Sequence, residues 1–142
     1  MTHSREGEKE NETHATFRLL GDALDPAEVT RVLGITPSFA RRKGDKYGGP
    51  RRPVASRTGI WALESEKSVT SADLEKHLEF LLNQLDAKAS FVAELTRGGL
   101  TADILCYWMS ATGQGGPVLG AATIRRIAEL GVDLDFDCYS AV

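Results

Sequence analysis

The densest group of side chains able to bind an anion lies in one segment, residues 39–57. It contains seven basic residues and one acid, Asp45, which gives it a net charge of +6. Because the whole 142-residue chain has a net charge of −3, the other residues carry −9. Guanidinium and ammonium groups bind phosphate and carboxylate, and a tyrosine can stack on a base. The segment therefore predicts a binding surface made of Arg41, Arg42, Lys43, Lys46, Tyr47, Arg51 and Arg52, with Arg57 adding to the charge.

Several functions remain open for this basic segment. Glycines and prolines predict a loop, and loops of roughly 20 residues are uncommon unless they are functional or disordered. The favoured hypothesis is a non-enzymatic binding module for nucleic acid or an acidic protein. The alternatives are a solvated loop that aids solubility, an enzyme whose loop arginines hold an anionic substrate beside Asp45 or His77, and an immunity-type or regulatory protein whose acidic remainder meets a basic partner.

Three aspartates, Asp133, Asp135 and Asp137, alternate along a predicted strand and raise the question of a metal site. Residues on one face of a strand are about 6.6–6.8 Å apart, so the outer pair is about 13 Å apart. Hard cations need ligands at ~2.0–2.6 Å. We therefore expect no metal ligand, and a solvated face with Arg125 and Arg126 as candidate partners.

The glycine-rich turn, the histidines and the cysteines match no pattern typical of catalysis or of cofactor binding. The glycines of residues 113–116 lack the third glycine of a dinucleotide loop, because Val118 stands there, so a plain turn and no cofactor are expected. Of the histidines His3, His14 and His77, the last is expected on the surface of a helix. Cys106 and Cys138 are expected to be buried, inert thiols. No catalytic residue is predicted.

Length and composition indicate a single globular domain. The chain is 42% hydrophobic and 26% charged, with two cysteines and no apolar run near the ~20 residues of a membrane span. The N-terminus lacks the apolar region of a secretory signal, so a cytoplasmic location and no membrane partner are expected. Residues 1–13 are polar and are expected to form a disordered tail, followed by one domain over residues 14–142.

The first half of that domain predicts two strands and two helices. Residues 15–19 alternate as a strand, Asp25-Pro26 starts a short helix, and Gly34 ends it. Residues 59–63 predict a second strand. A helix is expected from an N-cap at Thr70-Ser71 to about residue 86, because leucines recur on one face, with Leu78 and Leu82 at its centre.

The second half predicts three strands and one helix. Residues 91–95 and 100–109 are expected to form a hairpin around Gly98-Gly99, followed by a helix over 121–130 and a strand over 132–139. Both short helices end in Leu-Gly and a β-branched residue, which makes a duplicated half-domain one interpretation. The element order predicts an α+β fold with a mostly antiparallel sheet of about five strands, helices on one face and a ferredoxin-like arrangement.

Motifs spread along the chain resemble a known family. They include Phe17-Arg18-Leu19 with Gly21-Asp22, Leu33-Gly34-Ile35-Thr36-Pro37, Lys43-Gly44-Asp45, Gly59-x-Trp61-x-Leu63 and the terminal residues 131–139. In order and spacing they resemble the bacterial family called domain of unknown function 4279, from about residue 13 to residue 139. The resemblance implies a small stand-alone α+β protein and no catalytic residues. This chain has Arg41-Arg42 where the family is expected to have an aromatic residue such as Trp.

Overall fold

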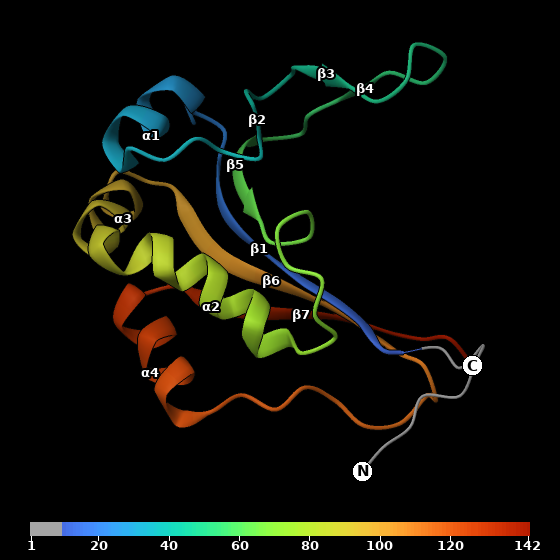
Figure 1. The fold of residues 1–142 in the computed structure, drawn as a ribbon. Coiled ribbons are helices and arrows are strands. Elements are labelled where there is room, and N and C mark those ends of the chain that lie inside the picture. The colour runs from blue at the N-terminus through green and yellow to red at the C-terminus, as the bar shows by residue number, and fades with distance from the viewer. Residues whose placement is uncertain (1–9) are drawn as a thin grey trace.

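The computed structural model describes residues 10–142, which form one α+β structure (Figure 1). The elements in chain order are β1 (Glu12–Gly21), α1 (Pro26–Leu33), β2 (Phe39–Arg41), β3 (Lys46–Tyr47), β4 (Val54–Ala55), β5 (Gly59–Glu64), α2 (Leu74–Leu85), the 3₁₀ helix η1 (Asp86–Lys88), α3 (Ala89–Arg97), β6 (Thr101–Ser110), α4 (Ala121–Leu130) and β7 (Asp133–Ser140).

Five of the strands form one sheet in the order β2-β5-β1-β6-β7. The central strand β1 pairs antiparallel with β5 and β6, and β2 pairs antiparallel with β5. β6 and β7 are parallel and are connected through α4, as a parallel pair requires a crossover. The predicted α+β class and the mostly antiparallel sheet of about five strands are confirmed.

The helices cover one face of this sheet and form the core with it (Figure 1). Alternate residues of β1 point toward them, and Ala15, Phe17 and Leu19 have no exposed surface. The leucine face of α2 packs on this layer, with Leu78 and Leu82 fully buried as predicted. Trp61 of β5 is fully buried too, and its indole N–H donates to Thr30 Oγ1 of α1 at 3.0 Å.

Capping residues set the ends of the first two helices. Asp25 caps α1 as predicted, because its carboxylate accepts from Ala27 N at 3.1 Å, and Gly34 ends the helix at φ 68°. α2 begins later than expected. Its N-cap is Asp73, whose side chain accepts from Glu75 N, while Ser71 Oγ accepts from Asp73 N in the preceding turn. A carboxylate three residues after Thr70 replaces the predicted hydroxyl cap.

The predicted strand over residues 91–95 and its hairpin are wrong. These residues lie in α3, where Val92 is buried and Leu95, three residues on, packs against the same core. Gly98 N donates to Glu94 O at the end of this helix, and Gly99 at φ 112° turns the chain into β6. The glycine pair therefore ends a helix, and β6 finds its antiparallel partner in β1.

The last strand has the predicted alternation, but the side chains on its helix-facing side are more exposed to solvent than expected. β7 is an edge strand, and Phe136 is 46% exposed although it lies on the helix side. Cys138 is exposed, which corrects the prediction of a buried thiol, whereas Cys106 is buried and burial raises the pKa of its thiol to about 12.

Three further expectations concern the arrangement of the chain. The ferredoxin-like arrangement is not confirmed, since α2 and α3 stand between β5 and β6, where a βαββαβ order joins two strands directly. The duplication is not confirmed either.

The expected boundary between tail and domain, at residue 14, falls inside β1, and Asn11 Oδ1 already accepts from Ala111 N at 2.8 Å. The rest of the predicted tail, residues 1–9, lies outside the described residues. No helix over residues 10–142 is long and apolar enough to cross a bilayer.

Candidate functional site

The basic segment forms an ordered hairpin rather than the predicted irregular loop. We call residues 39–57 the basic hairpin. It leaves the sheet through β2, and β3 pairs antiparallel with β4, with Lys46 opposite Ala55 and Tyr47 opposite Val54. Figure 1 shows it projecting from the sheet on the side away from the helices. Most of its residues are therefore exposed.

A compact turn at the base holds the hairpin together. Arg42 N donates to the carboxylate of Asp45 at 2.7 Å, and Asp45 N donates to Arg42 O at 3.0 Å. Two cross-strand bonds follow, from Gly44 N to Ser56 O and from Ser56 N to Asp45 O, both 2.8 Å. Gly44 adopts φ 89°, a conformation that favours glycine. The single acid of the segment is thus used to fold it.

Arg41 connects the hairpin to the sheet through aromatic contacts. Its guanidinium carbon lies 3.8 Å from the centre of the Tyr47 ring and 4.8 Å from that of Phe39. Its Nε is buried without a hydrogen-bond partner in the described part of the chain. A guanidinium over an aromatic face is stabilised by the ring quadrupole. Arg41 therefore orients the hairpin more than it offers free charge, and it occupies one face of the Tyr47 ring.

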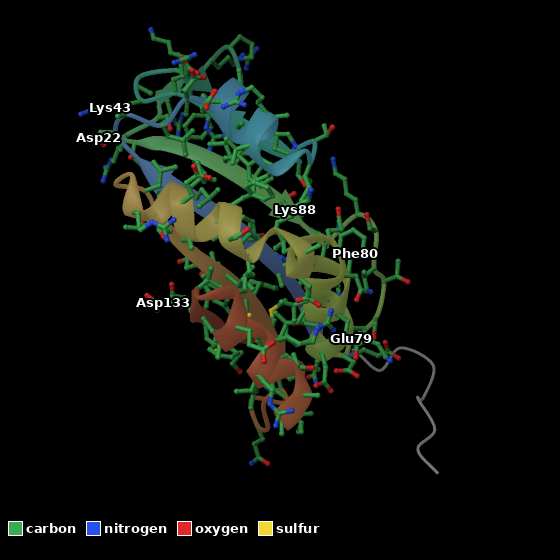
Figure 2. All side chains as sticks on the ribbon, turned by 90° about the vertical axis from the view of Figure 1, so that its left-hand side faces the viewer. Asp22, Lys43, Glu79, Phe80, Lys88 and Asp133 are labelled. Atoms are coloured by element: carbon green, nitrogen blue, oxygen red, sulfur yellow. The ribbon has the colours of Figure 1, made fainter. Side chains whose placement is uncertain are left out.

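Two more of the predicted cations pair with the body of the protein. Arg42 Nη2 lies 2.8 Å from Asp25 Oδ1, the same oxygen that caps α1. Lys43 Nζ lies 3.0 Å from Asp22 Oδ2, and Figure 2 labels this pair. The hydrogen bond from Lys43 lowers the pKa of Asp22. All four side chains are about half exposed or more, so the pairs locate the base of the hairpin while adding little stability.

Four cations on the hairpin stay free of acids. We call them the free hairpin cations: Lys46, Arg51, Arg52 and Arg57. All are exposed, and no ion pair joins any of them to a carboxylate among residues 10–142. Tyr47 and its cross-strand neighbour Val54 are 42% and 48% exposed beside them. The hairpin thus presents positive charge around a small apolar patch.

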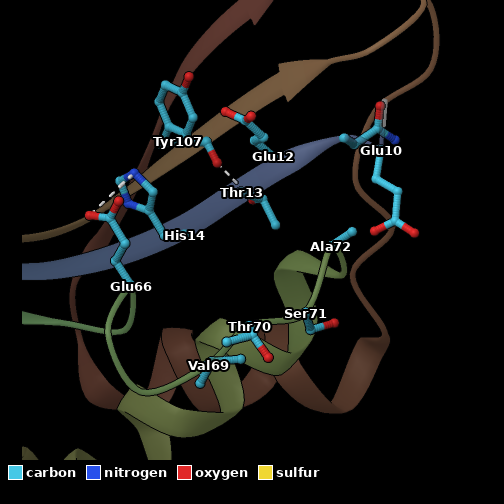
Figure 3. A pocket seen from close by; sticks show the side chains of 11 residues that line it. Glu10, Glu12, Thr13, His14, Glu66, Val69, Thr70, Ser71, Ala72 and Tyr107 are labelled. Carbon is cyan, nitrogen blue, oxygen red and sulfur yellow. Dashed lines mark hydrogen bonds and ion pairs between the residues drawn. The ribbon is translucent and has the colours of Figure 1, made fainter. Parts of the chain in front are cut away.

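A separate cleft of about 460 Å³ lies at the far end of β1 (Figure 3). His14 stacks on Tyr107 with ring centres 4.7 Å apart, and its Nε2 lies 4.0 Å from Glu66 Oε2. The rim carries the carboxylates of Glu10 and Glu12. Residues 10–14 and 66–72 meet here because β1 pairs with β5, and Tyr107 joins them because β1 pairs with β6; both are long-range contacts without a local sequence signal. No residue of the basic hairpin lines this cleft.

His77 is buried, which corrects its predicted surface position. Its exposed fraction is 1%, and its Nε2 is 2.7 Å from Ser71 O, so that nitrogen donates. Nδ1 then accepts from Ser65 Oγ at 2.7 Å, and Ser65 Oγ accepts from Ala15 N at 2.9 Å. Since Ser65 has no exposed surface, this serine and histidine cannot reach a substrate. They connect β1 to α2.

The three aspartates of β7 lie on the sheet face opposite the helices, in register with Asp103, Leu105 and Tyr107 of β6. The prediction that Arg125 and Arg126 pair with these aspartates is wrong. Arg126 pairs with Asp86 at 2.7 Å, and no ion pair involves Arg125 among the described residues. On the same face, Arg18 donates to both carboxylate oxygens of Asp103 at 2.9 and 2.6 Å.

Asp103 and Asp135 share this neighbourhood and have opposite pKa shifts. The hydrogen bond with Asp103 raises the pKa of Asp135. Burial acts to raise the pKa of Asp103 as well, but hydrogen bonds from Arg18 and Asp135 hold it below its usual value. The pKa of Asp135 is therefore raised while that of Asp103 is lowered.

A comparison with protein-family models matches residues 11–141, nearly the whole chain, to the family Domain of unknown function (DUF4279). The chain belongs to this family. A search of curated proteins and a search of solved structures each found no match. Membership in DUF4279 confirms the resemblance drawn from the motifs and assigns no role to any residue.

The arginine pair Arg41-Arg42, which departs from the expected DUF4279 pattern, contributes to the placement of the hairpin. Arg41-Arg42 stands where an aromatic residue is expected, and in this chain Arg41 lies against Phe39 and Tyr47 while Arg42 pairs with Asp25. Two cations therefore help to hold the hairpin in place without being part of its free charge.

Proposed function

We propose that this chain is a binding module whose basic hairpin engages an anionic macromolecular partner. The observation that carries the proposal is the set of free hairpin cations, exposed on a projecting and ordered hairpin and unpaired with any described acid. A cytoplasmic location fits this proposal and stays a prediction.

Order in the hairpin favours binding because less conformational entropy is lost when a partner docks. The base is fixed by the turn at Asp45, by Arg41 on Tyr47 and by two ion pairs to the body. The acidic remainder of the chain does not cancel the charge at the tip, because charges more than ~8 Å away are largely screened at physiological ionic strength. Clustered positive charge also accelerates encounters with an anionic partner.

The enzyme alternative needs hairpin arginines to converge with a base at a cleft, and the geometry does not favour it. The Asp45 carboxylate is engaged by Arg42 N, and His77 is buried in the network with Ser65. The clefts near His14, Leu24 and Trp108 are lined by residues outside the hairpin. A projecting hairpin suits a macromolecular partner better than a small substrate.

The test uses duplex DNA as a dense polyanion of regular charge spacing. The wild-type chain should be retained on immobilised duplex DNA at low salt, and the variant R51E/R52E should pass through. The matched control K67E/R125E has the same net charge and changes two exposed cations outside the hairpin, so it should be retained like wild type. Thermal melts of all three check the fold. Loss of retention in the control as well, or a wild type that is never retained, contradicts the proposal.

A further inference from the structure

The sheet has a second face, opposite the helices, which we call the open face. The register of the strands places the following residues on it: Phe39 and Arg41 of β2, Ile60, Ala62 and Glu64 of β5, Glu12, His14, Thr16, Arg18 and Leu20 of β1, Thr101, Asp103, Leu105, Tyr107 and Met109 of β6, and Asp133, Asp135, Asp137 and Tyr139 of β7. In Figure 1 the helices all lie on the other side. Tyr47 of the hairpin lies on Arg41 at one end of the open face and Glu66 lies beside His14 at the other, and no helix over residues 10–142 covers the strands between them.

The centre of the open face is close to neutral and partly apolar. Arg18 and Asp103 neutralise each other through their double hydrogen bond, and their side chains are only 26% and 13% exposed. Leu20, Ile60 and Leu105 are half-buried around them. Tyr107 and Tyr139 form an aromatic pair with ring centres 5.5 Å apart. Such a surface resembles the sheet faces that pack against another protein layer.

The two edges of the open face carry opposite charge. On one edge, β7 presents the acidic edge, which consists of Asp133, Asp135 and Asp137. On the other edge, β2 leads into the basic hairpin with its free cations. The hairpin leaves the sheet toward the open side, as Figure 1 shows. The face is therefore polarised across its strands, from positive to negative.

We propose that the open face binds a second copy of this chain, with the basic hairpin of each copy lying over the acidic edge of its partner. This inference rests on the proposed function and names the anionic partner. A two-fold axis that lies in the interface and runs along the strands reverses the strand order, so the β2 edge of one copy faces the β7 edge of the other. The complementary contact is then made twice.

The dimensions of the face suit this arrangement. Strands about 4.8 Å apart with a rise of about 3.3 Å per residue give a face on the order of 600 Å². The hairpin adds contact area, and a standard interface buries about 800 Å² per partner. Sheets packed face to face keep their strands within about 30° of each other, which agrees with an axis along the strands.

A different dimer, with the two β7 edges paired side by side, is disfavoured by the same charges. It would bring the acidic edges of both copies together, and like charges on an edge strand prevent such pairing. A polyanion on the hairpin alone would leave Tyr107, Tyr139 and the half-buried leucines uncovered. A second copy covers both the face and the hairpin.

Charge exchange tests the dimer. Sedimentation of the full chain should show a wild-type dimer whose dissociation constant rises with salt. K46E/R51E/R52E/R57E reverses the four free hairpin cations and takes the segment from +6 to −2, and D133K/D137K takes the acidic edge from −3 to +1, so each variant alone repels itself across both contacts. Each should raise the dissociation constant by at least about tenfold. An equal mixture should form a heterodimer, since both contacts become attractive again.

The control E94K/E129K changes two exposed acids on helices of the other face and should dimerise like wild type. A wild type that stays monomeric at the highest attainable concentration overturns the dimer, as does a mixture that stays monomeric. If that monomeric wild type is still retained on duplex DNA through the hairpin, the proposed function stands and only the second copy is rejected. If the mixture forms heterodimers but the wild type is not retained on duplex DNA, the dimer is supported and general polyanion binding is rejected.

Discussion

Single side chains determine whether the positive charge of this chain is available for binding. Arg41, Arg42 and Lys43 look equivalent to Arg51 and Arg52 in the sequence, yet the first three contact aromatic rings or carboxylates and the last two contact no acid among the described residues. The difference arises because the first three stand at the base of the hairpin, within reach of Asp22 and Asp25. Position in the fold, more than residue type, selects the free cations.

Replacing Arg41 with alanine should loosen the hairpin. The variant loses the contact with Tyr47 and Phe39, which is expected to cost about 0.5–2 kcal/mol of stability. Amide hydrogen exchange should become faster at Tyr47 and Val54 and stay unchanged in β6. R51A, which removes a cation without an ion-pair partner, provides the control. Equal exchange in R41A and R51A would show that the stacking does not order the hairpin.

The Asp103 and Asp135 pair predicts a pH dependence with a definite sign. Because the pKa of Asp135 is raised in the folded state, folding favours its protonated form, and its contribution to stability is lost as pH rises from about the ordinary value of 3.8 through the raised pKa. D135N removes this loss. It should therefore be more stable than wild type at neutral pH.

Denaturant midpoints measured across pH check this expectation. The advantage of D135N should shrink as pH falls through the raised pKa toward 3.8, and it should be absent below 3.8, where wild-type Asp135 is protonated in both states. D103N should behave in the opposite way, because the lowered pKa of Asp103 stabilises the fold above the ordinary value and that stability is lost as pH falls. A D135N advantage of the same size at every pH would contradict the raised pKa of Asp135.

At the scale of elements, local patterns predicted most helices and strands, and long-range packing decided the rest. The leucine repeat of α2 and the Asp25 cap of α1 were sufficient to predict these helices, because each pattern lies within a single helix or at its end. The prediction for residues 91–95 failed because five residues with four apolar side chains, Val92 and Leu95 among them three positions apart, fit both a short strand and one helical turn. Their burial against the core settles the choice. His77 was misplaced for a similar reason, since its partners Ser65 and Ser71 lie in other segments.

Truncating a side chain between α2 and the sheet should cause the largest loss of stability. Leu82 is fully buried on the sheet-facing side of α2, so L82A should lower the free energy of unfolding by about 2–5 kcal/mol. Urea denaturation measures this change. N83A, one residue further along the same helix but exposed, serves as the control and should remain within about 0.5 kcal/mol of wild type. A midpoint unchanged by L82A would contradict the packing of α2 on the sheet.

At the scale of the whole molecule, charge is separated although the net charge of −3 is small. Counting charges in the sequence located the positive segment over residues 39–57, and the binding role of its residues stays a prediction. The sequence did not predict which cations would be paired, that the hairpin would project from the open side of the sheet, or that an acidic edge would lie across the face from it. These features depend on strand order, which a single sequence does not reveal.

We expect the free hairpin cations to form an anion-binding surface, and the salt dependence of binding to fluorescent duplex DNA measures this property. Anisotropy titrations at low protein concentration, where self-association is negligible, should show log affinity falling against log salt. Four phosphate contacts predict a slope of roughly −3.6, and R51A/R52A should reduce its magnitude by about 1.8. A slope that R51A/R52A leaves unchanged, or an absence of binding at low salt, would contradict the account.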